Sequence, residues 1–273
     1  MSKAIFVLST GRCGTQWLAN FLKDNYSDTY HVEHEPLHNS YNPRKMIARV
    51  SDTDLASDWY QPIKKHTEKL NRLLKHSNYI ECGHPCWSSI PFLINNLDVP
   101  VKVIHLTRHP VYTACSWLTH SAFQPSILPH LQEKVLLSPF DKDVLFHEYK
   151  ERWDKITPFE KCLYYWAEVN GFGLDLKKRM GPDLIRICYE DVFQGDGLVE
   201  ILDFMDRPFK KEIHTIKKQT IDKYYYLTSE VFDPEIISLH PAILNVAESL
   251  GYDALKFDKK RLHKRYSGSH LFR

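Results

Sequence analysis

The sequence predicts an α/β protein of three layers, in which helices cover both faces of a central parallel sheet of about five strands. Short, continuously apolar runs such as 4–8 are typical of strands that are buried on both faces. Along the chain these runs alternate with stretches whose apolar residues recur at helical spacing, which is the pattern of βαβ units. The length of 273 residues allows one large domain or two small ones, and we favour a single domain over 1–273.

The individual elements follow from these patterns in chain order. The first strand leads into a tight turn, and from Gly14 the apolar residues Trp17, Leu18, Phe21 and Leu22 recur at helical spacing. The apolar run predicts a strand over 4–8, and further strands are predicted over 29–34, 78–82, 101–106 and 184–189. Helical spacing predicts further helices over about 59–75, 88–96, 111–119, 159–178 and 198–205.

Two segments depart from this alternation. Residues 121–157 combine Pro, His and Ser with helical pieces and no clear strand, so we expect a mostly helical cap inserted into the domain. Residues 254–273 include the basic run KKRLHKRYSGSH at 259–270, for which we expect a solvated C-terminal tail. No internal repeat is visible.

The composition is that of an ordinary globular protein, with 43% hydrophobic residues, 26% charged residues and a net charge of +2. This charge balance requires neither a nucleic acid nor a membrane partner. No run of about 18 apolar residues predicts a membrane span, and the run 4–8 is too short for a signal peptide. The six cysteines are scattered through predicted strands and helices. We therefore expect reduced thiols and a cytoplasmic location.

A glycine-containing turn, STGRCGT at 9–15, joins the first strand to the first helix. Backbone amides at such a turn, at the positive end of the helix dipole, form a ready site for an anion. Gly11 and Gly14 let the backbone approach a ligand closely. Arg12 adds a fixed positive charge with directed donors, and the hydroxyl of Thr15 can cap the helix or donate. The pattern predicts a bound anion, and a βα turn without a ligand is the alternative.

Three common phosphate-binding motifs are absent from this turn. The P-loop of nucleoside triphosphatases needs a second glycine followed by lysine, but Gln16 stands five positions after Gly11. A cysteine phosphatase needs an arginine six positions after its nucleophile, but that position after Cys13 is Ala19. The spacing of Gly11 and Gly14 also breaks the dinucleotide fingerprint. The turn therefore suits a small terminal anion better than a triphosphate.

A second cationic site follows the fourth predicted strand, in the segment LTRHPVYTACSW at 106–117. Arg108 stands at the carboxyl end of that strand, where ligands bind in open α/β sheets. Ser116 lies eight positions later, within the following helix. Two separated sites at one edge of the sheet predict a ligand with two separated anionic groups.

Together, segments 9–17 and 106–117 resemble the two nucleotide-binding motifs of sulfotransferases that use 3′-phosphoadenosine 5′-phosphosulfate (PAPS). The first motif of that family is usually P-[KR]-S-G-T-T-x-[WL]. The resemblance implies a fold like that of P-loop NTPases, PAPS as the sulfuryl donor, and binding of the 3′-phosphate by Arg108 and Ser116. The residues implied to cradle the 5′-phosphosulfate are Gly11, Arg12, Cys13, Gly14, Thr15 and Gln16. Cys13 and Gln16 replace hydroxyl residues of the family, so these two positions supply no hydroxyl.

Two further segments extend the resemblance. ICYEDVF at 187–193 resembles the family's R-Y-E-D-L segment, which implies that Tyr189 lies near the nucleotide. Residues 220–253 resemble the C-terminal section of tyrosylprotein-type sulfotransferases, in which a lysine before an aromatic residue reaches the cofactor. Lys223 is the matching position. The pattern is closest to tyrosylprotein-type and bacterial carbohydrate sulfotransferases.

An acceptor hydroxyl must lose a proton during transfer, so a general base is expected. Glu35, after the second predicted strand, matches the catalytic glutamate of tyrosylprotein and many bacterial carbohydrate sulfotransferases. His84, after the third, matches the catalytic histidine of cytosolic small-molecule sulfotransferases. We prefer Glu35, with His84 as the alternative base or as a residue that binds the acceptor. Glu33 and His34 are nearby substitutes.

The expected activity is sulfuryl transfer from PAPS to an acceptor hydroxyl by in-line displacement, in which positioning and charge stabilisation dominate. Arg12 and the loop amides are expected to stabilise the charge that grows on the leaving nucleotide, and no metal is expected. The predicted acceptor is a carbohydrate. A lipid-linked glycan, a peptide tyrosine and a small metabolite stay open, as does the oligomeric state. The rival functions are a P-loop nucleotide-dependent phosphotransferase (a kinase) and a non-catalytic nucleotide-binding protein.

Overall fold

The computed structural model of the protein describes residues 2–41, 43–46, 61–125, 133–194, 196–208 and 232–266. The chain forms two compact units. The first comprises Met1–Thr107 and Gly173–Gln219, and the second comprises Arg108–Phe172 and Thr220–Arg273.

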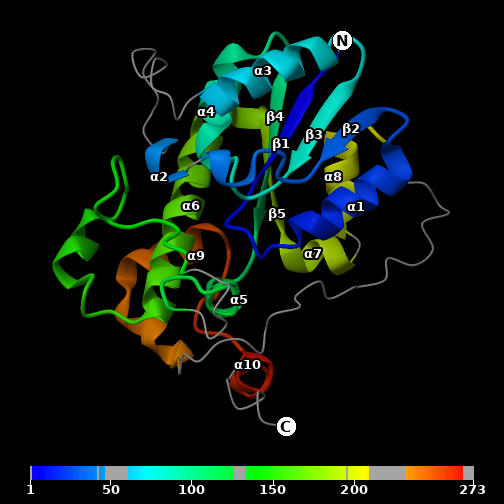
Figure 1. Cartoon of the computed structure of the whole chain (residues 1–273). Coiled ribbons are helices and arrows are strands. Elements are labelled where there is room, and N and C mark those ends of the chain that lie inside the picture. Colours follow the sequence, from blue (N-terminus) through cyan, green and yellow to red (C-terminus); the bar gives the residue numbers. More distant parts are fainter. Residues whose placement is uncertain are drawn as a thin grey trace. The chain divides into compact units, whose positions relative to one another are not determined.

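The first unit contains a sheet of five parallel strands in the order β2-β3-β1-β4-β5 (Figure 1). The strands are β1 (Ala4–Leu8), β2 (Tyr30–Glu33), β3 (Asn78–Cys82), β4 (Val101–Thr107) and β5 (Leu184–Cys188). The parallel sheet and all five strands are confirmed, with each strand end within one residue of its expected position. Because β2, β3 and β1 are neighbours and run in the same direction, the loops that follow them leave the sheet at one edge.

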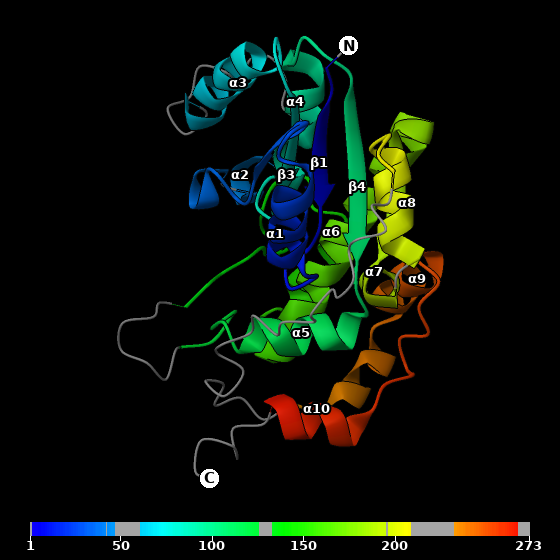
Figure 2. The same ribbon diagram turned by 90° about the vertical axis from the view of Figure 1, so that its right-hand side faces the viewer.

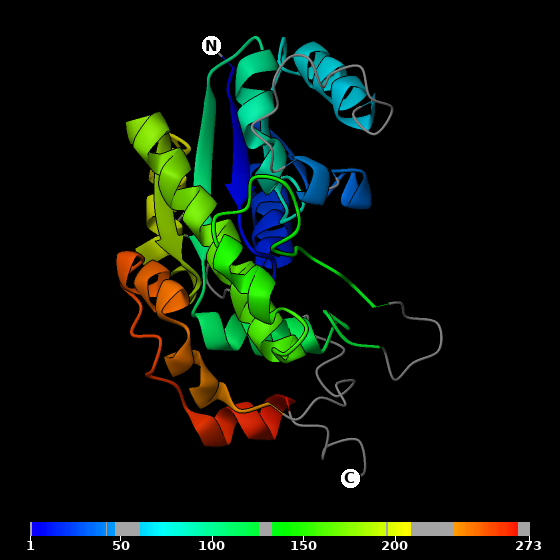
Figure 3. The same ribbon diagram turned by 90° about the vertical axis from the view of Figure 1, so that its left-hand side faces the viewer.

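Helices cover both faces of this sheet. In Figures 1 and 2, α1 (Thr15–Tyr26), α7 (Tyr189–Gln194) and α8 (Asp196–Phe204) lie on one face. Figure 3 shows α4 (Ile90–Asn96) on the opposite face, to which α3 (Gln61–Leu73) also belongs. The expected three layers are therefore present. Within the described residues, no helix has both the length and the apolar character needed to cross a bilayer.

The smaller elements of this unit lie mostly in its loops. They are the helix α2 (Pro43–Met46) and the 3-10 helices η1 (His38–Tyr41), η4 (Trp87–Ser89) and η6 (Gly181–Asp183). None of these was predicted separately, because a single turn is too short to show a helical period.

The strand side chains alternate between the two faces of the sheet. One set forms a buried core with α1, α7 and α8, and it includes Ile5, Val7, Ile80, Cys82, Ile104, Leu106, Ile187, Leu18, Leu22, Val192, Leu198 and Ile201. The intervening residues Phe6, Tyr79, Glu81 and His105 therefore face the opposite layer. This second face is more polar than a buried strand usually is, and it holds a fully buried carboxylate, Glu81.

The second unit is built on α6 (Pro158–Met180), which begins in this unit and ends in the first. Its other elements are α5 (Pro110–Leu118), η5 (His147–Arg152), η7 (Pro234–Leu239), α9 (Pro241–Ser249) and α10 (Lys259–Tyr266). A buried histidine, His240, joins some of these elements. Its Nδ1 accepts from the Tyr149 hydroxyl at 2.8 Å, and its Nε2 donates to the Glu160 carboxylate at 3.0 Å. His240 thus ties η5 and α6 to the junction between η7 and α9.

The cap is less helical than predicted. The described residues 121–125 and 133–157 contain one 3-10 helix, η5, and an isolated bridge between Ala122 and Lys134. The Glu168 carboxylate of α6 accepts the backbone amides of Leu145 at 2.9 Å and of Phe146 at 2.8 Å. Because a side chain accepts the hydrogen bonds of these two amides, the segment does not need a helix to provide acceptors for them.

The described part of the basic tail forms α10, which differs from the solvated tail expected from sequence. Leu262 and Tyr266 are 0% and 1% exposed, whereas the lysines between and before them face solvent. The two buried residues are four positions apart and so share one face of the helix. A basic run with only two apolar residues gave too weak a period to predict this helix.

Candidate active site

The loop after β1 has the backbone geometry of an anion-binding turn. Three of its residues have positive φ angles, which are 75° at Gly11, 60° at Arg12 and 80° at Gly14. Such a conformation is unusual for arginine and costs about 1–3 kcal/mol. A left-handed residue beside a right-handed one, as Gly14 is beside the helical Thr15, turns neighbouring amides toward one side, which forms a concave nest for an anion. The strain at Arg12 therefore coincides with the predicted binding loop.

The loop is held in place by its own side chains. The Gly11 amide donates to Ser9 Oγ at 3.0 Å, and the Thr10 hydroxyl donates to the Gly11 carbonyl at 2.9 Å. The Cys13 thiol donates to the same carbonyl at 3.1 Å, and Cys13 is only 1% exposed. The Cys13 side chain thus serves the interior of the loop, so its contribution to a ligand is limited to its backbone.

Gly14 brings Tyr189 against the loop. Gly14 is the N-cap of α1, and no side chain among the described residues caps this end. A Cβ at Gly14 would lie 3.1 Å from the Tyr189 ring, so the ring packs directly on this glycine. The Phe193 ring lies between those of Tyr189 and Trp17 and is tilted against both, with ring centroids 4.7 Å and 4.9 Å away respectively. The structure therefore brings Tyr189 together with the loop.

Glu35 and His84, the two candidate bases, lie in contact. Glu35 follows β2 and His84 follows β3, and the His84 Nδ1 lies 2.8 Å from Glu35 Oε1. Gly83 makes this contact sterically feasible, because a Cβ there would lie 2.6 Å from the Cγ of Glu35. Both side chains are partly exposed, 17% for Glu35 and 22% for His84. Glu35 and His84, which the sequence offered as alternative bases, therefore form one hydrogen-bonded pair.

Thr15 and two more histidines extend this pair. His34 Nε2 lies 3.4 Å from the Thr15 hydroxyl and 3.8 Å from Glu35 Oε1. His38 Nδ1 lies 3.8 Å from Glu35 Oε2. The first residue of α1, directly after the anion loop, is therefore linked through His34 to the Glu35–His84 pair. Sequence reasoning missed His38, although its position in the segment HVEHEPLH was a signal.

The environment keeps Glu35 ionised. Burial raises the pKa of Glu35, but hydrogen bonding to His84 and the nearby charges of His84 and His34 outweigh burial and lower it to about 2. Burial lowers the pKa of His34, against the opposing effect of Glu35. A carboxylate of such low basicity is better suited to orient His84 and stabilise its charged form than to accept a proton alone.

The second predicted anion site lies in the second unit. Arg108 directly follows β4, and its carbonyl accepts from Trp166 Nε1 at 2.8 Å. Ser116 is in α5 and 1% exposed. The N-cap of α5 is His109, whose Nδ1 accepts from the Val111 amide at 3.3 Å. Burial lowers the pKa of His109 to about 4, so this cap is neutral at physiological pH.

Two further residues were predicted to bind the cofactor. The Gln16 side chain donates to Asn20 Oδ1 at 3.3 Å along α1. Lys223 lies outside the described residues.

Comparison with family models shows the family of this chain. A family model described as "Sulfotransferase domain" matches residues 2–229. No curated protein sequence matches the chain significantly. Among solved structures, a sulfotransferase domain from the curacin biosynthetic pathway has a TM-score of 0.50 and 15% identity, and covers 93% of this chain and 99% of that chain.

Two further solved structures match over most of the chain. The sulfotransferase domain of the Synechococcus PCC 7002 olefin synthase has a TM-score of 0.48 and 16% identity, covering 92% of this chain and 95% of its own. A sulfotransferase from Alicyclobacillus acidocaldarius has a TM-score of 0.47 and 11% identity, covering 95% and 98% respectively. Identities this low bear on fold alone.

Proposed function

This chain belongs to the sulfotransferase domain family and is a sulfotransferase, and we propose that it transfers the sulfuryl group of PAPS to an acceptor hydroxyl with the Glu35–His84 pair as its proton acceptor. The observation that carries the proposal is the 2.8 Å contact between His84 Nδ1 and Glu35 Oε1. This pair is linked through His34 to Thr15, the residue that follows the anion loop.

The loop after β1 is proposed to hold the 5′-phosphosulfate. When bound, PAPS supplies an activated sulfuryl group on a nucleotide phosphate. The positive φ angles at Gly11, Arg12 and Gly14 support an arrangement of amides suited to a small tetrahedral anion. The Arg12 guanidinium and the amides of the first turn of α1 stabilise negative charge as it grows on the departing phosphate.

The other nucleotide contacts are proposed from the family resemblance. Arg108 and Ser116 bind the 3′-phosphate, and Lys223 reaches the nucleotide from the C-terminal section. Tyr189 lies near the nucleotide, which its packing on Gly14 supports. Arginine suits the phosphate because its planar fork donates two parallel hydrogen bonds.

His84 and Glu35 have different tasks in the proposed mechanism. The His84 Nδ1–H donates to Glu35 Oε1, which fixes the ring tautomer and leaves Nε2 as the proton acceptor. His84 Nε2 takes the proton of the acceptor hydroxyl as the oxygen attacks sulfur, and the ionised Glu35 stabilises the imidazolium that forms. The earlier preference for Glu35 as the sole base is thereby replaced by a pair.

A carbohydrate hydroxyl is the proposed acceptor. The support is the resemblance of the Glu35 segment to the branch that includes bacterial carbohydrate sulfotransferases. A peptide tyrosine or a small metabolite would use the same pair, because each presents a hydroxyl to be deprotonated. Transfer of labelled sulfate to a set of glycans, tyrosine peptides and small alcohols separates these classes.

The cytoplasm is the proposed compartment. All six cysteines are free thiols, and five of them are buried. Proteins of oxidising compartments commonly use cysteines in disulfides, whereas reduced thiols are usual in the cytoplasm.

Isothermal titration distinguishes the proposal from a kinase or a nucleotide sensor. We expect adenosine 3′,5′-bisphosphate to bind more tightly than ATP, without enhancement by Mg²⁺. Tighter binding of ATP, further strengthened by Mg²⁺, would contradict the proposal. Since a non-catalytic sensor would also bind the bisphosphate, Glu35→Gln and His84→Ala complete the test. Each should lower the rate of sulfuryl transfer about 100-fold or more and leave nucleotide affinity unchanged.

A further inference from the structure

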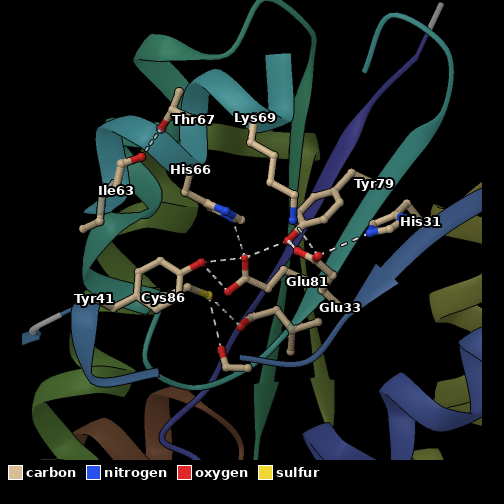
Figure 4. A network of polar contacts seen from close by, with 12 residues as sticks. His31, Glu33, Tyr41, Ile63, His66, Thr67, Lys69, Tyr79, Glu81 and Cys86 are labelled. Carbon is tan, nitrogen blue, oxygen red and sulfur yellow. Dashed lines mark hydrogen bonds and ion pairs between the residues drawn. The ribbon is translucent and has the colours of Figure 1, made fainter. Parts of the chain in front are cut away.

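A fully buried carboxylate lies behind the candidate active site. Glu81 is in β3, 0% exposed, and faces the layer that contains α3. Figure 4 shows its carboxylate at the centre of a polar network. Burying a carboxylate is unfavourable unless its oxygens are paired and hydrogen-bonded, and an apolar residue of similar volume commonly stabilises a core at least as well. Stability alone therefore gives little reason for a glutamate here.

Two tyrosines satisfy Glu81. The Tyr41 hydroxyl lies 2.6 Å from both carboxylate oxygens, and the Tyr79 hydroxyl lies 3.1 Å from Oε2. His66 Nε2, on α3, lies 3.6 Å from the same oxygen. Burial and the charge of Glu81 raise the pKa of Tyr41 and of Tyr79 well above their ordinary value. Both hydroxyls therefore stay protonated and act as donors, and the single proton of Tyr79 is shared between Glu81 and Glu33.

Tyr79 also joins Glu81 to the end of β2. Its hydroxyl lies 2.8 Å from Glu33 Oε2, and Lys69 on α3 donates to Glu33 Oε1 at 2.9 Å (Figure 4). Hydrogen bonds from Lys69 and Tyr79 outweigh burial and lower the pKa of Glu33, so this carboxylate is ionised. Glu33 is the last residue of β2 and stands two positions before Glu35.

The network thus holds both ends of the segment that carries Glu35. We define this segment, residues 34–40, as the strap. Glu33 precedes the strap and Tyr41 follows it, and both are tied to β3, through Tyr79 and Glu81 respectively. Within the strap, Glu35 and His38 have φ angles of 48° and 43°. Positive φ angles in residues other than glycine cost about 1–3 kcal/mol each and persist only where the surroundings enforce them.

The residues that follow β3 supply His84, the partner of Glu35. The chain runs from Glu81 in β3 through Gly83, just after the strand, to His84, so one short stretch anchors the strap, leaves room for Glu35 and presents its partner. We propose that Glu81 is a positioning residue for sulfuryl transfer, which holds the strap through Tyr41 so that the Glu35 carboxylate meets His84. This inference rests on the proposed roles of Glu35 and His84.

Tyr41→Phe is the central test, because it removes the donor to Glu81 and keeps the ring. Tyr30→Phe is the matched control. Tyr30 is as buried as Tyr41, and its hydroxyl donates to the Met205 carbonyl at 2.9 Å, away from the strap. Glu81→Gln is the second variant, which keeps the shape of the side chain and removes its charge. Each protein is measured for kcat, for affinity toward adenosine 3′,5′-bisphosphate and, by carbon-13 NMR, for the pKa of Glu35.

We expect Tyr41→Phe and Glu81→Gln to lower kcat at least 10-fold beyond any loss in Tyr30→Phe, with unchanged nucleotide affinity. The pKa of Glu35, about 2 in the wild type, should rise toward 4.5 in both variants as contact with His84 is lost. Equal kcat and equal Glu35 pKa in Tyr41→Phe and Tyr30→Phe would overturn the inference, and this holds even if Glu81→Gln fails to fold. The NMR result does not require activity. If the wild type transfers no sulfate but the pKa of Glu35 still rises in Tyr41→Phe, the proposed function fails and the positioning by Glu81 stands.

Discussion

At the scale of single residues, the candidate site combines a cationic loop residue, an ionised carboxylate with its histidine partner, and a glycine that makes room for them. Arg12 adopts a strained backbone at a turn for anions, Glu35 is ionised by its histidine neighbours, and Gly83 provides the space in which Glu35 and His84 meet. Sequence motifs identified Arg12, Glu35 and His84. The 2.8 Å contact could not be predicted, because it depends on the alignment of β2 with β3 and on the side-chain volume missing at Gly83.

Arg12 is the residue for which we expect the largest single effect. Arg12→Ala should lower kcat/KM for PAPS by about 100-fold to 1,000-fold, because it removes a charged donor from the growing charge on the leaving group. Lys23→Ala, at an exposed site in the last turn of α1, is the control and should leave kcat/KM unchanged. Steady-state kinetics measures both, and wild-type rates in Arg12→Ala would remove this residue from the mechanism.

Glu35 should make the stability of the protein depend on pH. Its pKa is about 2 in the folded protein and 4.5 ordinarily, so the unfolded chain takes up the proton first as pH falls. The stabilisation is present above about pH 4.5 and is lost toward pH 2. By linkage, Glu35 contributes about 2 kcal/mol less at pH 3 than at pH 6. Urea denaturation at a series of pH values measures the free energy of unfolding, and Glu35→Gln should lack this pH-dependent contribution. An identical pH dependence in the wild type and Glu35→Gln would disprove the lowered pKa.

At the scale of elements, all five strands and the long helices were predicted from the sequence. The clearest patterns were the continuously apolar run 4–8 of a buried parallel strand and the helical spacing of apolar residues in amphipathic helices. Tyr189 was placed at the end of a strand, but it begins α7, where Glu190 and Asp191 favour a helix N-terminus. The sequence also predicted a mostly helical cap and a solvated tail, whereas the described cap residues contain only one 3-10 helix and the tail forms α10. Their conformation depends on distant partners, as the amides that bind Glu168 illustrate.

Gly83→Ala tests the junction between β3 and the strap. A Cβ at this position would lie 2.6 Å from Glu35 Cγ and 3.0 Å from the Glu35 amide nitrogen, so backbone and side chain must both move. We expect kcat to fall about 10-fold to 100-fold and stability to fall by about 1–3 kcal/mol. Affinity for adenosine 3′,5′-bisphosphate serves as the internal control and should stay the same. A wild-type kcat would show that the position of Glu35 is not critical.

Leu262→Ala tests whether α10 is a packed part of the protein. Leu262 is fully buried, so its truncation should lower the free energy of unfolding by about 2–5 kcal/mol. Lys260→Ala, on the exposed side of the same helix, should change it by less than about 0.5 kcal/mol. Chemical denaturation compares the two. Equal stabilities would mean that the helix contributes nothing to the fold.

At the scale of the whole molecule, family membership and the central parallel sheet agree with the predictions made from motif order alone. The loop after β1 and the ends of β2 and β3 share one sheet edge, which is why residues 15, 34, 35 and 84 meet although they are distant in sequence. The acceptor could not be predicted in the same way, because acceptor binding depends on loop surfaces that carry no shared motif.

The substitution Arg108→Ala tests the second anion site. The wild type should bind adenosine 3′,5′-bisphosphate more tightly than adenosine 5′-phosphate, and Arg108→Ala should remove that preference. Lys178→Ala, at an exposed position in α6, is the control. Calorimetric titration of both nucleotides measures the difference. A preference that survives in Arg108→Ala would assign the 3′-phosphate to other residues.

Labelled sulfuryl transfer tests the central claim most directly. Wild-type protein, Glu35→Gln and His84→Ala are each supplied with sulfur-35 PAPS and a panel of glycan, peptide and small-alcohol acceptors. We predict that the wild type labels at least one acceptor, and that both variants lose about 100-fold or more of this rate while binding adenosine 3′,5′-bisphosphate normally. Full transfer by both variants, or no label on any acceptor with the wild type, would contradict the assignment of this pair to sulfuryl transfer from PAPS.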